Sequence, residues 1–271
     1  ITLPFSNQFI LATESETEAF GISSDSKWLM SSGSFNKAII WNLENGEIQK
    51  TLTFEAPVVS IALSPDSKKS YVGTANNKIF EVNMENYEIK NIFGDANLPA
   101  VAMRVSKNNK YLIALRNFLI LDIFDIQNQK KLYSFTFPID NTITGFSENP
   151  QTNNFFILRK DNSITEYDIN TGEALIVHAL ATNSEKNFLR KMTVTDNGIL
   201  FYSDIQDSTE SLIMKNLQSG QVNHATNVRI FSSNIVVNKD ASLLYVNSLN
   251  NFITRFDLSN LKPDEEINVP Q

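Results

Sequence analysis

The sequence predicts an all-β fold built from six copies of a four-stranded module. Three observations lead to this prediction. A short polar turn recurs six times at nearly constant spacing, a strand ending in an aromatic or apolar residue recurs with almost the same period, and no unit shows helical periodicity. The regular supply of turn residues also leaves no room for the long crossovers of a parallel α/β sheet.

The recurring turn is polar, and apolar segments with strand character flank it on both sides, as in "SSDSKWLM" and "SPDSKKSYV". Its polar centres are Asp25, Asp66, Asn108, Asn149, Asp196 and Asp240, at steps of 41, 42, 41, 47 and 44 residues. Asp, Asn, Ser and Gly favour tight turns, so each copy predicts a β-hairpin. We therefore interpret the recurring aspartates as turn formers with a structural role.

About sixteen residues after each turn comes a strand such as "AIIWN" or "ITEYD". Its aligned positions are Trp41, Val82, Phe124, Tyr167, Lys215 and Phe256, at steps of 41, 42, 43, 48 and 41 residues. We interpret Trp41 and Phe256 as residues that pack between blades. A further turn such as "ENGE" or "NTGE" follows, and then a fourth strand. Four strands in about 40 to 45 residues are typical of a propeller blade.

We therefore expect a β-propeller of four-stranded antiparallel blades in a single domain, 1–271. Its repeats lie at about 17–54, 57–93, 99–137, 140–180, 188–225 and 231–271. Residues 1–16 contain strand-like segments. A strand from this region would complete a neighbouring blade and cover exposed sheet edges, so we predict a six- or seven-bladed ring. Alternatively, the chain, which starts at Ile1 without an initiator methionine, is one part of a longer propeller protein.

The composition excludes several kinds of chemistry. The chain has no cysteine and only two histidines, His178 and His224, so disulfides and thiolate zinc sites are excluded. We expect no metal and no cofactor, and we interpret the acidic set Asp204, Asp207 and Glu210 as a solvated loop, because it lacks EF-hand spacing. The net charge of −7 argues against nucleic acid, and no apolar stretch approaches the ~20 residues of a membrane-spanning helix.

With the repeats aligned, the chain resembles the WD-repeat family from about Thr17 to Asp257. The segment "SPDS" at Ser64–Ser67 is similar to that family's first hairpin, and "IIWN" at Ile39–Asn42 to the strand with its Trp-Asp pair. In "DNSITEYD", Asp161–Asp168, a tyrosine replaces the tryptophan. In that family a His, a Ser or Thr, an Asp and a Trp form a buried chain of hydrogen bonds within a blade. No unit here has the family's Gly-His pair, so this chain is incomplete and we expect the blades to depend more on apolar stacking. Lactonase and surface-layer propellers have similar turn sequences.

The resemblance implies that partners bind the propeller face formed by the loops between second and third strands and the loops that lead into each blade. Aromatic and arginine side chains dominate interface energetics, and four of them occupy equivalent positions in neighbouring repeats. The predicted partner-binding residues are Arg116, Arg159, Phe188 and Phe231. The alternative is that the phenylalanines plug their own blades and the arginines pair with loop carboxylates.

The function expected from these features is a non-enzymatic scaffold or adaptor that binds other proteins within a larger intracellular assembly, in the cytoplasm. The chain has no Asn-x-Ser/Thr glycosylation acceptor, which fits that location. Two alternatives stay open: a lactonase-like propeller hydrolase with a central metal, and an inert spacer in a multi-domain chain. No insertion into a membrane and no direct contact with nucleic acid are expected.

Overall fold

The structure is a computed structural model, and it describes most of the first half of the chain and the sheet-forming segments of the second. The described residues are 19–32, 36–93, 97–149, 151–152, 154–161, 163–179, 192–195, 197–206, 209–226, 235–237, 242–248, 252–258 and 262–268. Within these ranges the chain forms strands and turns, with no helix.

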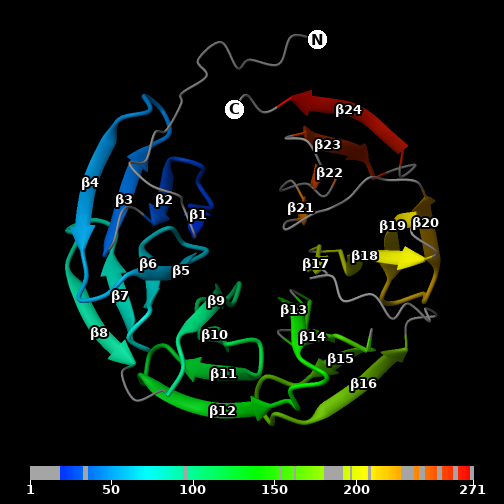
Figure 1. Ribbon diagram of the computed structural model, residues 1–271, viewed down its shortest axis with the longest axis horizontal. Coiled ribbons are helices and arrows are strands. Elements are labelled where there is room, and N and C mark those ends of the chain that lie inside the picture. The colour runs from blue at the N-terminus through cyan, green and yellow to red at the C-terminus, as the bar shows by residue number, and fades with distance from the viewer. Residues whose placement is uncertain are drawn as a thin grey trace. The chain divides into compact units, whose positions relative to one another are not determined.

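The described strands form six four-stranded antiparallel sheets, and each sheet follows chain order (Figure 1). The first three sheets consist of β1 (Phe20–Ile22), β2 (Trp28–Ser32), β3 (Lys37–Asn42) and β4 (Ile48–Thr53); β5 (Val58–Leu63), β6 (Lys69–Thr74), β7 (Ile79–Asn83) and β8 (Ile89–Phe93); and β9 (Ala100–Val105), β10 (Tyr111–Arg116), β11 (Ile120–Asp125) and β12 (Lys130–Thr136).

The last three sheets consist of β13 (Ile143–Glu148), β14 (Phe155–Arg159), β15 (Ser163–Tyr167) and β16 (Ala174–Ala179); β17 (Met192–Val194), β18 (Ile199–Gln206), β19 (Thr209–Asn216) and β20 (Val222–Thr226); and β21 (Ile235–Val237), β22 (Leu243–Ser248), β23 (Phe252–Asp257) and β24 (Lys262–Asn268). The chain divides into two compact units, one up to Thr136 and one from Phe137, with three sheets each. The predicted all-β fold of four-stranded antiparallel modules is confirmed, and the number of blades in a ring stays a prediction.

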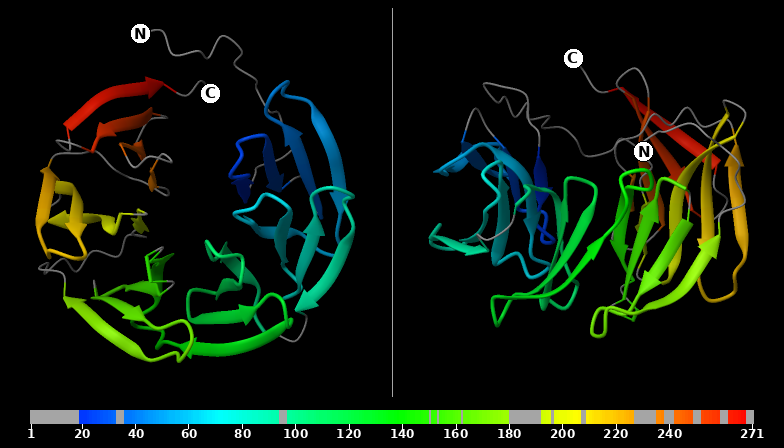
Figure 2. Two further views of the ribbon diagram at one scale, coloured as in Figure 1. Left: turned by 180° about the vertical axis from the view of Figure 1, so that it is seen from behind. Right: turned by 60° about the horizontal axis from the view of Figure 1, so that its bottom comes forward.

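Within the first unit, the sheets pack face to face through alternating apolar side chains. In the second sheet Val72 and Phe80 join a core cluster with Met30 and Ile40 of the first sheet. Tyr71, next to Val72 on β6, joins the opposite cluster with the third sheet. Because successive side chains of a strand point to opposite faces, one strand supplies both interfaces. In the same unit β4, β8 and β12 lie on one side and β1, β5 and β9 on the other (Figures 1 and 2).

The second unit repeats this arrangement. Phe156 and Leu158 of the fourth sheet pack with Leu200 of the fifth. Phe201, the next residue on β18, packs with Phe256 of the sixth sheet, and the Phe256 side chain is fully buried. The aromatic position of the third strand is therefore a packing position between sheets, as the sequence predicted for Phe256.

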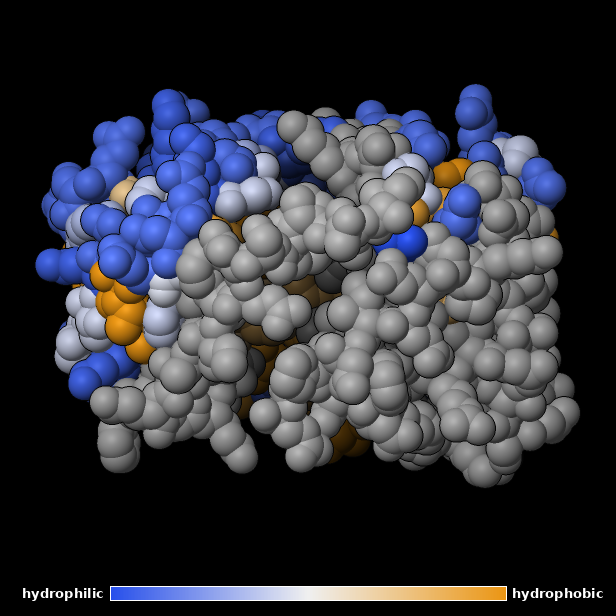
Figure 3. Space-filling model, turned by 90° about the horizontal axis from the view of Figure 1, so that it is seen from above, coloured by the Kyte–Doolittle hydropathy of each residue, from blue (hydrophilic) through white to orange (hydrophobic). Residues whose placement is uncertain are grey.

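The described surface carries polar residues with scattered apolar ones. Figure 3 shows one side of the molecule, on which the described part is mainly hydrophilic with small separate hydrophobic areas. The most exposed large apolar residue is Ile139, at 81%, in the turn before β13. In the described part of the chain there is no helix long and apolar enough to cross a membrane.

Gly73 of β6 provides a test of the packing between the second and third sheets. A Cβ atom at this position would collide with Ser60 Oγ and would lie 2.9 Å from the Ala100 carbonyl oxygen. We predict that Gly73→Ala lowers the free energy of unfolding by about 1 to 3 kcal/mol, as overpacking does. Gly21→Ala is the control, because its Cβ would meet only the tip of the flexible Leu63 side chain at 2.6 Å and atoms of Ile61 beyond 3.5 Å. Denaturant unfolding measures both, and equal losses would contradict the packing argument.

Candidate functional site

The first hairpin of several sheets is held by one repeated hydrogen-bond motif. In the second sheet the Ser64 hydroxyl donates to Asp66 Oδ1 at 2.6 Å and accepts from the Lys69 N–H at 2.9 Å. The first and third sheets repeat this with Ser23 and Asp25, and with Ser106 and Asn108. The structural role predicted for Asp25 and Asp66 is therefore the closing of this turn by local side-chain hydrogen bonds.

The fifth sheet shifts the motif by one residue from the position that the sequence pattern indicated. Thr195 Oγ1 bonds to the side chain of Asn197 and accepts from the Ile199 N–H at 3.1 Å. Asn197 therefore occupies the position of Asp66, whereas the sequence alignment placed Asp196 there. Asp196 itself lies outside the described residues.

The residue that ends this turn has a left-handed backbone in each of these four sheets. It is Ser26 (φ 59°), Ser67 (φ 61°), Asn109 (φ 59°) or Gly198 (φ 76°). Glycine adopts this conformation without steric cost, and asparagine tolerates it better than most residues. The described turns between third and fourth strands also contain one residue with positive φ. This residue is a glycine in three sheets (Gly46, Gly172 and Gly220), but it is Tyr87 in the second sheet and Gln129 in the third.

A groove lies between the second and third sheets, at the edge where these turns gather. Its volume is about 400 Å³, and we call it the inter-sheet groove. It is lined by Ser64, Asp66, Lys69, Tyr71, Glu81, Asn109, Ile126, Gln127 and Gln129. The volume falls within the range of about 300 to 1,000 Å³ that is typical of ligand sites.

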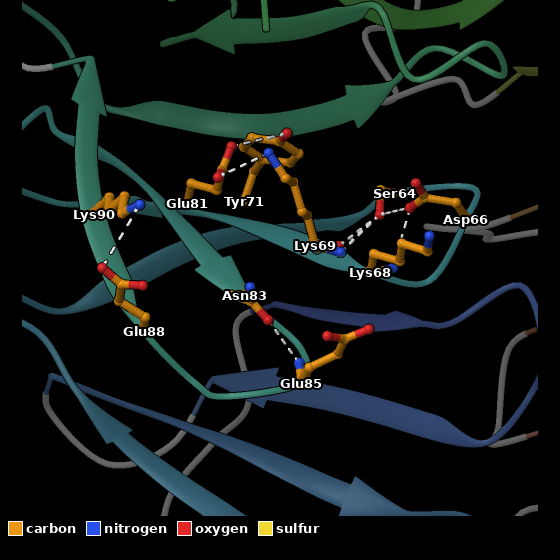
Figure 4. A network of polar contacts seen from close by, with 10 residues as sticks. All are labelled: Ser64, Asp66, Lys68, Lys69, Tyr71, Glu81, Asn83, Glu85, Glu88 and Lys90. Carbon is orange, nitrogen blue, oxygen red and sulfur yellow. Dashed lines mark hydrogen bonds and ion pairs between the residues drawn. The ribbon is translucent and has the colours of Figure 1, made fainter. Parts of the chain in front are cut away.

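A network of polar contacts crosses the side of the groove formed by the second sheet (Figure 4). Lys69 Nζ lies 2.9 Å from Glu81 Oε1, and the Tyr71 hydroxyl donates to Glu81 Oε2 at 3.3 Å. The three residues come from β6 and β7, where Tyr71 and Glu81 are directly paired. Burial raises the pKa of Tyr71 well above its ordinary range, and the negative charges of Glu81 and Asp66 raise it further. Tyr71 is therefore a neutral donor that holds the Glu81 carboxylate in place.

Asp66 supplies a second negative charge at the rim. Partial burial alone would raise its pKa, but hydrogen bonds from the Ser64 hydroxyl and the Lys68 N–H, together with the charge of Lys68, hold the pKa below the ordinary value of 3.8. Asp66 is therefore ionised at neutral pH. The lining then carries two carboxylates, of Asp66 and Glu81, against one ammonium, of Lys69.

The third sheet contributes amide side chains to the groove. Asn109 Oδ1 is buried and has no hydrogen-bond partner in the described part of the chain. A buried acceptor without a donor costs about 1 to 3 kcal/mol in comparable proteins. Gln129 lines the same groove with φ 49°, at a position that three other sheets fill with glycine. Tyr87, which does not line the groove, has the same left-handed backbone, so the feature specific to the groove is the unpaired Asn109 oxygen.

The predicted partner-binding residue Arg116 lies inside the third sheet. Its side chain is only 4% exposed, and its Nε donates to Asp122 Oδ2 at 2.5 Å while its Nη1 donates to the Leu98 carbonyl at 2.7 Å. Asp122 is 2% exposed and also accepts from the Ser134 hydroxyl. This buried ion pair gives Arg116 a structural role, and a partner contact through it stays a prediction.

The other predicted residues fall in the second unit. Arg159 is partly buried: its Nη2 lies 3.4 Å from Thr165 Oγ1, its guanidinium carbon lies 5.9 Å from the Phe137 ring centroid, and its Nε has no hydrogen-bond partner among the described residues. Phe188 and Phe231 lie outside the described residues.

The two histidines belong to fourth strands of their sheets, His178 to β16 and His224 to β20. Of the acidic set expected in a solvated loop, Asp204 and Glu210 lie on the paired strands β18 and β19, and Asp207 lies outside the described residues.

The sequence analysis did not find the inter-sheet groove, which lies at the opposite edge of the sheets from the predicted partner face. Turns between strands one and two, and between strands three and four, share one edge of an antiparallel meander, whereas the predicted face used the loops between strands two and three. The sequence contains one difference at this edge. In the first repeat a glycine, Gly46, follows Asn42 by four residues, whereas at the equivalent position of the third repeat Gln129 follows Asp125.

The class of protein that this fold defines is the β-propeller, and comparisons with solved structures support it. The chain is similar to Kuenenia stuttgartiensis hydrazine synthase, with a TM-score of 0.75 and 15% sequence identity over 93% of this chain and 81% of that one. It is also similar to the Cps50 (Swd1) β-propeller domain of Myceliophteria thermophila, with a TM-score of 0.75 and 12% identity over 96% of this chain and 88% of that one. No protein-family model and no curated protein sequence matches the chain.

These similarities confirm the propeller fold. One feature of the WD-repeat family is present in part, because Trp41 Nε1 donates to the buried Ser31 Oγ at 2.9 Å. One of the two similar proteins is an enzyme by its name, so the fold alone does not decide between catalysis and binding. The described residues contain no group of three His, Asp or Glu side chains that could hold a metal ion.

The buried Arg116–Asp122 pair leads to a stability prediction. We predict that Asp122→Ala lowers the free energy of unfolding by about 3 to 5 kcal/mol, because it leaves the guanidinium buried without its carboxylate. The double variant Arg116→Met, Asp122→Leu should recover most of this loss, since a well-packed apolar pair can replace a buried ion pair. Urea unfolding measures both, and a double variant as unstable as Asp122→Ala would contradict this interpretation.

The turn aspartates lead to a prediction for acid conditions. The pKa of Asp25 is lowered mainly by the Ser23 hydroxyl and that of Asp66 by the bonds described above. A carboxyl with a lowered native pKa contributes stability above its unfolded pKa, near 3.9, and loses it as the pH falls through the native pKa. We predict that Asp25→Asn with Asp66→Asn makes stability less dependent on pH below about pH 5. Urea midpoints at neutral and acid pH measure this, and parallel curves for variant and wild type would contradict it.

Proposed function

We propose that this chain is a non-enzymatic propeller that binds other proteins, and that the inter-sheet groove holds a segment of a partner. The observation that carries the proposal is the buried Asn109 oxygen at the groove, which has no hydrogen-bond partner in the described part of the chain. This feature has a physical reason if the side chain contacts a ligand.

The shape and polarity of the groove support a peptide segment as the ligand. Tyr71 and Ile126 lie at the floor, where Ile126 keeps some exposed apolar surface at 9%, while Asp66, Gln127 and Gln129 are exposed at the rim. An apolar floor with a polar rim is the arrangement found where an anchor side chain of a partner is enclosed. The proposal includes a place in a multi-protein assembly inside the cell, for which the support is the sequence alone.

Substitution by glycine tests the groove without removing structural contacts. The double variant Asn109→Gly, Gln129→Gly should be at least as stable as wild type, because glycine relieves both left-handed positions. Ser26→Gly is the matched control, since it makes the same change in the equivalent turn of the first sheet, away from the groove. Circular dichroism and thermal unfolding confirm that the three proteins are folded.

The binding measurement compares the immobilised wild type and variants in native cell extract by quantitative mass spectrometry. We predict that one or more proteins bind the wild type and the Ser26→Gly control equally but bind the groove variant about tenfold less, which corresponds to about 1.4 kcal/mol. Equal capture by all three proteins would contradict the groove as the binding site. Calcium or zinc retained in stoichiometric amount after dialysis would contradict the non-enzymatic function and favour the metal hydrolase.

A further inference from the structure

We propose that the inter-sheet groove recognises an arginine side chain of the partner segment. This inference rests on the proposed function for its biological meaning, but the chemistry of the groove can be tested without a partner. It follows from the charge of the lining, from the balance of donors and acceptors, and from the apolar floor.

The charge of the lining favours a cation. Asp66 and Glu81 contribute two negative charges and Lys69 one positive charge, which gives −2 + 1 = −1 for the lining. Lys69 is already paired with Glu81 at 2.9 Å, so its charge is locally neutralised and Asp66 is the carboxylate left for a ligand. An anionic ligand would meet Asp66 and Glu81 together, which opposes its binding.

The hydrogen bonds of the groove favour a ligand that donates. The Tyr71 hydroxyl donates to Glu81, and the Ser64 hydroxyl donates to Asp66, so both hydroxyl donors are used within the protein. Asn109 Oδ1 is an acceptor without a donor among the described residues. A ligand that brings N–H groups would supply the missing donor and would meet the ionised Asp66 carboxylate in the same groove.

Arginine matches these features better than lysine. The guanidinium carries five N–H donors in a planar fork, so one side chain can serve a carboxylate and an amide oxygen at once. Its methylene groups can pack against Ile126, which is 9% exposed, while the charged end stays at the polar rim.

Positive charges outside the lining limit the range of this attraction. Lys68 acts on Asp66 from the neighbouring position, and Lys110 lies over the Tyr111 ring at 4.9 Å from its centroid. Attraction of a cation is therefore local to the lining, and screening limits it to about 8 Å at physiological ionic strength. We expect a weak affinity for an isolated side chain, with a Kd of about 1 to 10 mM.

The test is a titration of the full chain, followed by NMR of the backbone and side-chain amides, with three small probes. The probes are N-acetyl-arginine methylamide, its neutral isostere N-acetyl-citrulline methylamide, and N-acetyl-glutamate methylamide. We predict saturable shifts of the Asn109, Gln127 and Gln129 amides with the arginine probe, and binding of the citrulline probe that is about two- to fivefold weaker, as loss of one partly exposed charge implies. The glutamate probe should give no saturable shift.

Two matched variants locate the interaction. Asp66→Asn should weaken arginine binding about two- to fivefold, and its turn should stay closed, because Asn108 closes the equivalent turn of the third sheet. Asp25→Asn removes the same charge from the equivalent turn of the first sheet and should leave binding unchanged. Asn109→Gly should weaken the arginine and citrulline probes alike, since it removes the shared acceptor.

Equal binding of arginine and citrulline, saturable binding of glutamate, or an Asp66→Asn variant with unchanged affinity would overturn this inference. These outcomes are distinct from failure of the proposed function. If the arginine probe does not bind but the groove variant loses captured proteins, the groove binds a partner through another residue. If the probe binds but no captured protein depends on the groove, the recognition chemistry is correct and the proposed scaffold function is wrong.

Discussion

Face-to-face packing of neighbouring sheets is the constraint on which the rest of the structure depends. The second sheet shows it most directly: Val72 and Phe80 pack toward the first sheet, and Tyr71 and Ile79 pack toward the third. A shift of β6 or β7 by one residue would turn each apolar set to the opposite face and disrupt both interfaces. Gly73 lies so close to the third sheet that one methyl group would collide with the Ala100 carbonyl, and also with Ser60 on the neighbouring strand β5.

The inter-sheet groove exists because this packing ends before the sheet edge does. At the edge with the first hairpins, the apolar contacts stop at Tyr71 and Ile126, and the side chains beyond them are polar. The hairpins themselves stay closed through local hydrogen bonds between a serine or threonine and an aspartate or asparagine, and they need no help from the neighbouring sheet. Polar groups can therefore accumulate in the groove without loss of the fold, which leaves these positions available for binding.

The buried Arg116–Asp122 pair and the groove illustrate two different uses of charge. The pair is enclosed within the third sheet, where each partner compensates the other and the backbone carbonyl of Leu98 accepts a further hydrogen bond. The charges of the groove are partly exposed, and the Asn109 oxygen beside them has no partner within the described protein. Charged groups that satisfy one another support the fold, whereas the unpaired acceptor belongs to the lining of the groove that we propose as a binding site.

The sequence by itself determined the repeated module, its four strands and the turns that join them, because these depend on local preferences and on the two-residue period of strands. It also indicated the aromatic packing position of Phe256 and the turn role of Asp66. It did not determine the exact turn position in the fifth sheet, where Asn197 rather than Asp196 closes the hairpin, since either residue type suits a turn. Only the tertiary structure brought Asp66, Glu81 and Asn109 into one groove and placed Arg116 beside Asp122. Those groupings join residues of different strands and sheets, and side-chain contacts across a fold are set by packing rather than by spacing along the chain.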